Sequence, residues 1–323
     1  MYRRVFTALA LAAGLAPLAL SAQPAYPTKA VKFIVPYAPG GLPDTVARVV
    51  AKHLGDRIGQ AVVIDNRPGG NGVVAYQSLL QSNPSDGHSF IVSDGSMLSI
   101  TPLLNKAANY QVGKDILPVS LVARSPLFIV AHPKTGVNTL QEMVELARKR
   151  PGELTYGSSG IGSTHHLTME ALKASLNLDI RHVPYRGSGQ STPALVGGQV
   201  DLSVAALPSM AGFVKNNQVK ILASNALNRS PYAPEIPTVA ETIPGFDFSV
   251  VVGILAAAGT PQAAIDRISQ EVAQLVKHPE VVKTFDAAMI EAVGAGPAEY
   301  NQVISREAEI MAKAGKAADL KSE

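Results

Sequence analysis

Two glycine-rich turns contain the residues whose types and spacing are best suited to bind a ligand. The first, VPYAPGGLPD, spans residues 35–44, and the second, YGSSGIGSTHH, spans residues 156–166. Each follows an apolar run typical of a strand and precedes an amphipathic run typical of a helix. A helix that begins at such a turn directs unpaired N–H groups and the positive end of its dipole outward, so both turns are predicted to be anion sites.

The anion is expected to be a small carboxylate rather than a nucleotide, because neither turn has the lysine that follows the last glycine of a phosphate-binding loop. Two such sites in one chain suggest two lobes that hold one ligand between them. The expected ligand contacts in the turns are Tyr37, Ala38, Pro39, Gly40, Gly41, Asp44, Ser158, Ser159, Gly160, Gly162, Ser163 and Thr164. For Asp44, a capping role in the first turn of a helix is the alternative.

The elements that must position these turns alternate between strand and helix patterns. Strands are expected at 30–35, 61–65 and 90–92, with helices at 43–58 and 74–81 between them. Such alternation predicts an α/β fold with a parallel sheet covered on both faces. After a helix with a capping box at Thr139 and Glu142, the same alternation resumes and predicts a second sheet of the same kind.

The chain is expected to cross between the lobes twice. Residues 117–131 are rich in strand formers but are interrupted at 124–126, and residues 249–255 form a buried strand that returns. The predicted organisation is therefore a leader at 1–24, a first lobe at 25–125 and 248–323, and a second lobe at 126–247. Thr260 and Pro261 are expected to cap the first of three C-terminal helices, and the helical end is expected to pack on the first lobe.

Length and composition indicate a globular protein. The 323 residues are 46% hydrophobic and 16% charged, which is enough to bury a large core, and the length predicts two domains. The formal charge of +3 includes Arg3 and Arg4 of the expected leader, and no basic stripe is interleaved with aromatic residues. Nucleic acid is therefore excluded as the expected partner.

Residues 1–24 have the pattern of a cleaved secretory signal peptide. A basic start at Arg3 and Arg4 is followed by an apolar run from Val5 to Leu20 and by small residues before Gln23. The run is too short for a convincing membrane span. Because the chain has no cysteine, it needs no disulfide and cannot be a lipoprotein. A free periplasmic protein is expected.

Taken together, the motifs resemble those of the Bug family, the periplasmic solute-binding proteins of tripartite tricarboxylate transporters. The matching segments are YP at 26–27, IVPYAPGG at 34–41 followed by Asp44, NRPG at 66–69, residues 156–166, HVPYRG at 182–187, PTVAE at 237–241 and AGTP at 258–261. The resemblance implies a type II periplasmic-binding fold with two α/β lobes, a two-strand hinge and membrane transporter subunits as partners.

The resemblance also implies where the ligand binds. One carboxylate would lie between the turns at 37–41 and 158–164, with Tyr185, Gly187 and Ser188 on the second lobe and a loop containing Ser93, Asp94 and Ser96 on the first. Two departures concern the far end of the ligand. Ala205 and Ala206 replace a polar pair, and Val251 and Val252 replace two large aromatics. A ligand with an apolar or aromatic body is therefore expected.

Other functions fit the residues less well. A serine-nucleophile elbow needs glycine where Ile161 stands, so a hydrolase is disfavoured. His165 and His166 are adjacent, and neighbouring helical residues point about 100° apart, so no metal is expected there. The glycines at 157, 160 and 162 lack the spacing of a dinucleotide fold. The protein is expected to be a monomer without cofactor or enzymatic activity. A carboxylate sensor for a signalling partner is the alternative function. For Tyr185, packing in the core is as well supported as contact with the ligand.

Overall fold

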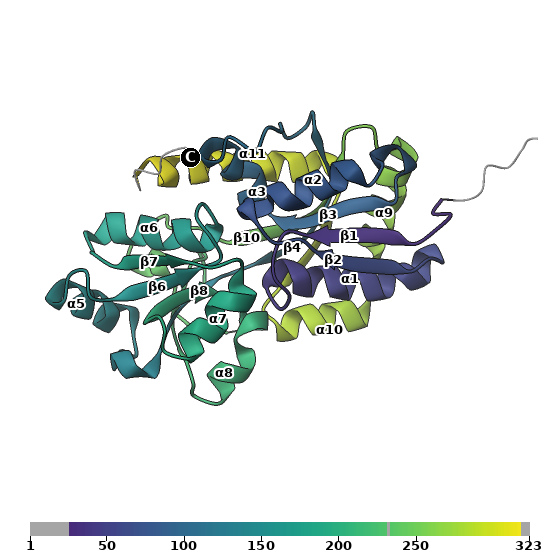
Figure 1. The fold of residues 1–323 in the computed structure, drawn as a ribbon. Coiled ribbons are helices and arrows are strands. Elements are labelled where there is room, and N and C mark those ends of the chain that lie inside the picture. Colours follow the sequence, from purple (N-terminus) through teal and green to yellow (C-terminus); the bar gives the residue numbers. More distant parts are fainter. Residues whose placement is uncertain (1–25, 231–232, 318–323) are drawn as a thin grey trace, which may run out of the picture.

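The computed structural model describes residues 26–230 and 233–317, which form two mixed sheets with helices on both faces (Figure 1). The leader expected at 1–24 lies outside the described residues. The first sheet has the order β11-β4-β10-β3-β1-β2 and consists of β1 (Val31–Val35), β2 (Val62–Asn66), β3 (Ser89–Asp94), β4 (Ile116–Ser125), β10 (Val250–Ala257) and β11 (Glu291–Ala295). The second has the order β7-β6-β8-β5-β9 and consists of β5 (Phe128–Ala131), β6 (Thr155–Ser158), β7 (Arg181–Pro184), β8 (Leu202–Ala205) and β9 (Lys220–Ser224).

The expectation of parallel sheets is right for the strands joined by helices and wrong for the others. β1 is parallel to β2 and β3, and β6 is parallel to β7 and β8. β10 is antiparallel to β3 and β4, β11 is antiparallel to β4, and β5 is antiparallel to β8 and β9. These strands lie next to neighbours to which no single crossover helix joins them, so the handed βαβ connection does not dictate their direction.

Helices cover both faces of each sheet. On the first sheet, Phe33 packs in one cluster with α1 (Leu42–Ile58), α9 (Gln262–Leu275) and α10 (Pro279–Ala287), while Ile34 packs in another with α2 (Val73–Gln81), α3 (Ser96–Ser99) and α11 (Pro297–Ala317). On the second, α5 (Leu140–Lys149) and α6 (Thr164–Leu176) lie on one face, and α7 (Ser188–Val196) and α8 (Ala211–Lys215) on the other. The remaining helical segments are α4 (Thr101–Leu104) and 3-10 turns at Gly70–Gly72, Pro84–Asp86, Pro133–Thr135, Leu207–Ser209 and Val239–Glu241.

The crossings between the sheets meet at one buried side chain, Asn225. Its Oδ1 accepts the N–H of Leu127 at 2.8 Å, and its Nδ2 donates to the carbonyl oxygen of Phe248 at 2.5 Å. Its backbone is hydrogen-bonded to the same two residues. Leu127 lies between β4 and β5, and Phe248 lies just before β10, so Asn225 connects the outgoing and returning segments.

The C-terminal helix α11 packs on β4 and α3 of the first sheet, as expected, but also on α6 of the second. Figure 1 shows it running along the top of the molecule, over both parts. The first sheet also gains β11, which the sequence did not indicate because its Gly294 and small alanines carry little strand signal. None of the helices in the described ranges combines the length and apolar composition needed to cross a bilayer.

Two expected helix caps are only partly formed. Thr139 accepts the N–H of Glu142 at 3.1 Å, but the Glu142 carboxylate accepts the N–H of Asn138, one residue before the position that a capping box requires. At α9 the cap residue is Pro261, which makes no side-chain bond, and the Thr260 hydroxyl has no partner among the described residues.

Candidate functional site

The first glycine turn joins β1 to α1 and is held by the carboxylate of Asp44. Asp44 accepts hydrogen bonds from the N–H of Gly40 at 2.9 Å, from Arg48 at 2.9 Å and from Asn66 at 2.9 Å. Burial alone would raise the pKa of Asp44, but the bonds from Arg48, Gly40 and Asn66 together lower it. Asp44 lies in the first turn of α1 but accepts the N–H of Gly40, one residue before the cap residue Gly41, so it braces the turn and does not cap the helix.

Tyr37, in the same turn, is oriented by a buried carboxylate at the end of β3. Its hydroxyl donates to Asp94 Oδ1 at 2.9 Å, and the hydroxyl and backbone N–H of Ser96 donate to the same oxygen. Burial raises the pKa of Asp94, while the bonds from Ser96 and Tyr37 oppose that rise. Burial also raises the pKa of Tyr37 well above its ordinary value, so this side chain stays a neutral donor.

The second glycine turn joins β6 to α6 and is held by three histidines. His182 Nε2 lies 2.6 Å from Ser158 Oγ, His165 Nδ1 lies 2.7 Å from Ser159 Oγ, and the N–H of Gly162 donates to His166 Nδ1 at 3.1 Å. The rings of His166 and His182 stack with their centres 4.0 Å apart.

All three imidazoles are neutral at ordinary pH. Burial lowers the pKa of His165 and of His166 to about 4 and that of His182 to about 3. His165 and His166 contact different partners, as adjacent helical residues must. The sequence placed both only near the cleft and gave no indication that they, with His182, brace the second turn.

Several of the N–H groups that the turns were expected to direct at a ligand are bonded within their own lobe. The Gly160 N–H donates to Ser158 Oγ at 3.1 Å, and the Ser163 N–H donates to the carbonyl oxygen of Gly160 at 3.1 Å. Ser163 also caps α6 by accepting the N–H of His166. Because Gly162 and Gly40 donate to His166 and Asp44, the turns use much of their donor capacity to hold their own shape.

The two lobes touch where the first turn meets the loop before α7. A Cβ on Gly189 would lie 2.2 Å from the carbonyl oxygen of Pro39, and one on Gly187, whose φ is +127°, would lie 3.2 Å from the N atom of Ala38. A Cβ on Gly41 would lie 2.7 Å from Ser188 Oγ. Backbone therefore packs on backbone here, and a side chain would force the lobes apart.

Beside this contact lies a cleft of about 430 Å³ between the lobes. Five of the expected contacts line it: Tyr37, Ser159, Gly160, Gly162 and Tyr185. The lining residues that the sequence did not single out are Pro36, Gly69, Gly70, Thr101, Asn105, Ile161, Pro184 and Arg186. The expected contacts that are not among the lining residues are Ala38, Pro39, Gly40, Gly41, Asp44, Ser93, Asp94, Ser96, Ser158, Ser163, Thr164, Gly187, Ser188 and Ala205.

Some of the lining residues that the sequence analysis overlooked could have been found from the sequence, and others could not. Pro36, Ile161 and Arg186 are sequence neighbours of expected contacts, whereas Thr101 and Asn105 come from a short helical segment without a motif. Ala205 is buried in β8 opposite Phe128. Val251 and Val252 likewise are not among the lining residues of the cleft.

The cleft has the electrostatic character of an anion site. Among the described residues that line it, Arg186 is the one charged side chain and no carboxylate occurs. Arg186 is exposed, and its guanidinium forms no ion pair with the described residues. The amide Nδ2 of Asn105 lies beside Gly70 on the facing wall, since a Cβ on Gly70 would be 3.7 Å from it.

Two α/β lobes joined by paired strands, with a polar cleft between them, define a two-lobed solute-binding protein. Residues 46–317 match the family described as "Tripartite tricarboxylate transporter family receptor". The chain belongs to this family, which confirms the resemblance seen in the motifs.

Individual relatives agree with this assignment. Protein BugT of Bordetella pertussis is 31% identical over 284 residues, which cover 87% of this chain and 87% of BugT. The structure titled "R. palustris Rpa4515 with adipate" superposes with a TM-score of 0.88 at 29% identity, covering 92% of this chain and all of that one. MatC (Rpa3494) from Rhodopseudomonas palustris with bound malate superposes with a TM-score of 0.83 at 26% identity, covering 90% and 99%.

Proposed function

We propose that the protein captures a small carboxylate in the cleft between its lobes and presents it to the membrane subunits of a tripartite tricarboxylate-type transporter. The observation that carries the proposal is the cleft itself, which lies between the two glycine turns and is lined by one cation, Arg186, with neutral donors and no carboxylate among its described residues. An anion entering it gains attraction without repulsion from the lining.

The relatives support a carboxylate as that anion. Two structures of the same fold contain adipate and malate, both of which are dicarboxylates. In this chain, Asn105 and Arg186 approach from opposite lobes, so a ligand that contacts both would favour the closed arrangement.

One hydroxyl of the second turn is available to the proposed site. Ser159 lines the cleft and is already oriented by His165. Such a fixed hydroxyl binds a carboxylate at little further cost in conformational freedom.

The body of the ligand is expected to be apolar or aromatic. The basis for this differs from the sequence argument, because Ala205, Ala206, Val251 and Val252 are not lining residues. Pro36, Ile161 and Pro184 instead supply apolar surface, and Tyr37 and Tyr185 supply aromatic rings.

The proposed role is binding without chemistry, by a monomer in the periplasm. It is supported by the family and by the lowered pKa values of the three histidines around the second turn, which make them weak bases at neutral pH. Turnover of a bound carboxylate by the pure protein would contradict the proposal of binding without chemistry. A stable dimer in light scattering would contradict the proposed monomer.

A thermal-shift screen of mono-, di- and tricarboxylates tests the ligand class, because a molecule that binds only the folded state raises the melting temperature. We expect C4–C8 dicarboxylates or aromatic carboxylates to give the largest shifts. Calorimetry on Arg186→Gln should then show roughly tenfold weaker binding, equivalent to about 1.4 kcal/mol. Arg181→Gln, an exposed arginine of β7 outside the cleft, is the matched control. Absence of any carboxylate shift, or equal affinities of the two variants, would contradict the proposal.

A further inference from the structure

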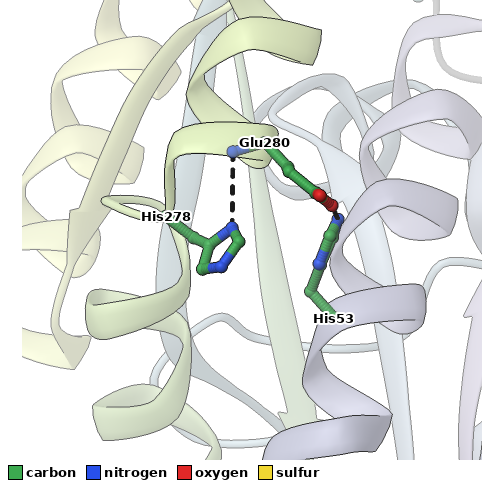
Figure 2. A group of neighbouring side chains, drawn as sticks. All are labelled: His53, His278 and Glu280. Atoms are coloured by element: carbon green, nitrogen blue, oxygen red, sulfur yellow. Dashed lines mark hydrogen bonds and ion pairs between the residues drawn. The ribbon is translucent and has the colours of Figure 1, made fainter.

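A cluster of two histidines and a glutamate lies in the first lobe, between α1 and the start of α10. His53 projects from α1, His278 is the cap residue of α10, and Glu280 lies in its first turn. One ligand atom from each lies within 4.8 Å of the others, which in the described ranges is true of no other group of three such residues. Figure 2 shows the Glu280 side chain extending from α10 to His53, with His278 on the same side.

The separations are close to those that a single metal ion imposes. His53 Nε2 and Glu280 Oε2 are 3.9 Å apart, and the ring centres of His53 and His278 are 5.4 Å apart. Two imidazoles bound to one zinc ion at about 2.1 Å in tetrahedral geometry have ring centres roughly 5 Å apart, and neighbouring ligand atoms roughly 3.4 Å apart. Small side-chain rotations therefore suffice to bring all three groups onto one ion.

We propose that His53, His278 and Glu280 bind a divalent transition-metal cation, with zinc the best fit. Two imidazoles and one carboxylate are ligands that suit zinc, nickel and copper, whereas magnesium and calcium favour oxygen ligands. Three protein ligands leave a fourth position for water. The site is separate from the ligand cleft and independent of the proposed transport function.

Binding requires one hydrogen bond to be exchanged. His278 Nδ1 accepts the N–H of Glu280 at 3.3 Å, and a neutral imidazole has only one nitrogen with a free lone pair. When the ion takes that lone pair, the cap bond is lost. The bond is long, so its loss offsets little of the metal's attraction, and a site of moderate affinity is expected.

The two helices that supply the ligands are held independently of the metal. Leu54 of α1 and Val281 and Phe285 of α10 are buried in the same core cluster. His53 itself is largely buried, with 14% of its side chain exposed, whereas Glu280 is exposed. The ion would thus link two preformed helices that are distant in the sequence.

The experiment is zinc titration of tag-free protein by calorimetry, with melting temperature as a second readout and Co²⁺ absorption as a report of tetrahedral geometry. One equivalent of Zn²⁺ should bind and raise the melting temperature, and Mg²⁺ should do neither. His53→Gln and His278→Ser should each weaken binding at least tenfold. Serine at position 278 preserves a helix cap, so that variant is expected to fold.

His132→Ser is the matched control. His132 is also a cap residue whose Nδ1 accepts a backbone N–H, from Lys134, but it belongs to no such cluster in the described ranges. Its substitution should leave zinc binding unchanged. The proposal is overturned if the unmodified protein shows no saturable zinc binding, or if binding survives in His53→Gln and His278→Ser.

Discussion

The two glycine turns have the same backbone plan but are supported by different chemistry. In the first, a charged group holds the turn: Asp44 binds the Gly40 N–H and the half-exposed Arg48. In the second, neutral rings do so: His166 accepts the Gly162 N–H and stacks on His182. A strand–glycine–helix motif therefore does not determine how its loop is braced, and the two braces should respond differently to pH and salt.

The largest effect on ligand binding is expected where the first turn meets the second lobe. Gly189→Ala places a Cβ 2.2 Å from the carbonyl oxygen of Pro39, so the lobes cannot close as they do now. We expect carboxylate affinity to fall about a hundredfold, equivalent to about 2.7 kcal/mol. Calorimetry measures the loss, and small-angle scattering should show a larger radius of gyration.

Gly212→Ala is the control for that variant, because no atom lies within 4 Å of the added Cβ and the residue lies in the helix α8. It should bind normally. Unchanged affinity in Gly189→Ala would show that the observed contact between the lobes is not needed for binding.

The histidine brace and the Asp44 brace should lose their contributions to stability in different ranges of acid pH. The folded-state pKa of His165 is about 4, against about 6.5 unfolded, so the unfolded chain binds more protons between these values. The free energy of unfolding should therefore fall as pH drops from about 6.5 to 4, by on the order of 3 kcal/mol for this imidazole alone. Asp44, whose pKa is lowered, loses its contribution only below about pH 4.

The contribution of Glu307 to the pH dependence of stability must be removed from that measurement. Burial raises the pKa of this carboxyl on α11, so the folded state binds its proton more tightly and its contribution has the opposite slope. Asp94, whose pKa burial also raises, remains in the Glu307→Gln background, so urea unfolding is compared there with and without His165→Asn, a pair that differs only in this imidazole. Equal slopes between pH 6.5 and 4 in the two variants would contradict the neutral-ring brace.

The brace formed by the Asp44 carboxylate should contribute less to the free energy of unfolding than the brace formed by the histidines. Asp44→Ala leaves the Gly40 N–H, Arg48 and Asn66 without their common acceptor, and we expect about 2 kcal/mol of destabilisation in urea unfolding. Asp65→Ala, which removes an exposed ion pair with Arg67 nearby, should cost at most about 0.5 kcal/mol. Equal losses in both would mean that burial of Asp44 adds nothing.

The smallest effect is expected from Ser159→Ala. The substitution removes the hydroxyl that lies 2.7 Å from His165 Nδ1 and lines the cleft. Stability should fall by about 1 kcal/mol and carboxylate affinity by up to about tenfold. Ser85→Ala, an exposed serine of the first lobe, is the control. No change in affinity would place Ser159 in the brace alone.

Local patterns predicted most of the strands and helices and the two turns, because hydrophobic period and glycine chemistry are encoded within a few residues. They missed β11 and α4, whose residues carry little local signal. They did not predict how distant segments combine. His182 reaches Ser158 only because β7 lies beside β6, and Asn105 reaches the cleft only because α4 lies next to Gly70. The antiparallel direction of β10 also depends on its pairing with β4, a strand distant in the sequence, and not on the residues of β10 themselves.

Asn225 gives the molecule a fixed pivot. Because one side chain connects Leu127 to Phe248, the outgoing and returning segments cannot shift past each other without breaking its bonds. Rotation of one sheet against the other then moves atoms least at Asn225 and progressively more with distance from it. If the lobes rotate when a ligand binds, an angular change small enough to leave these bonds intact would become a larger displacement at the cleft.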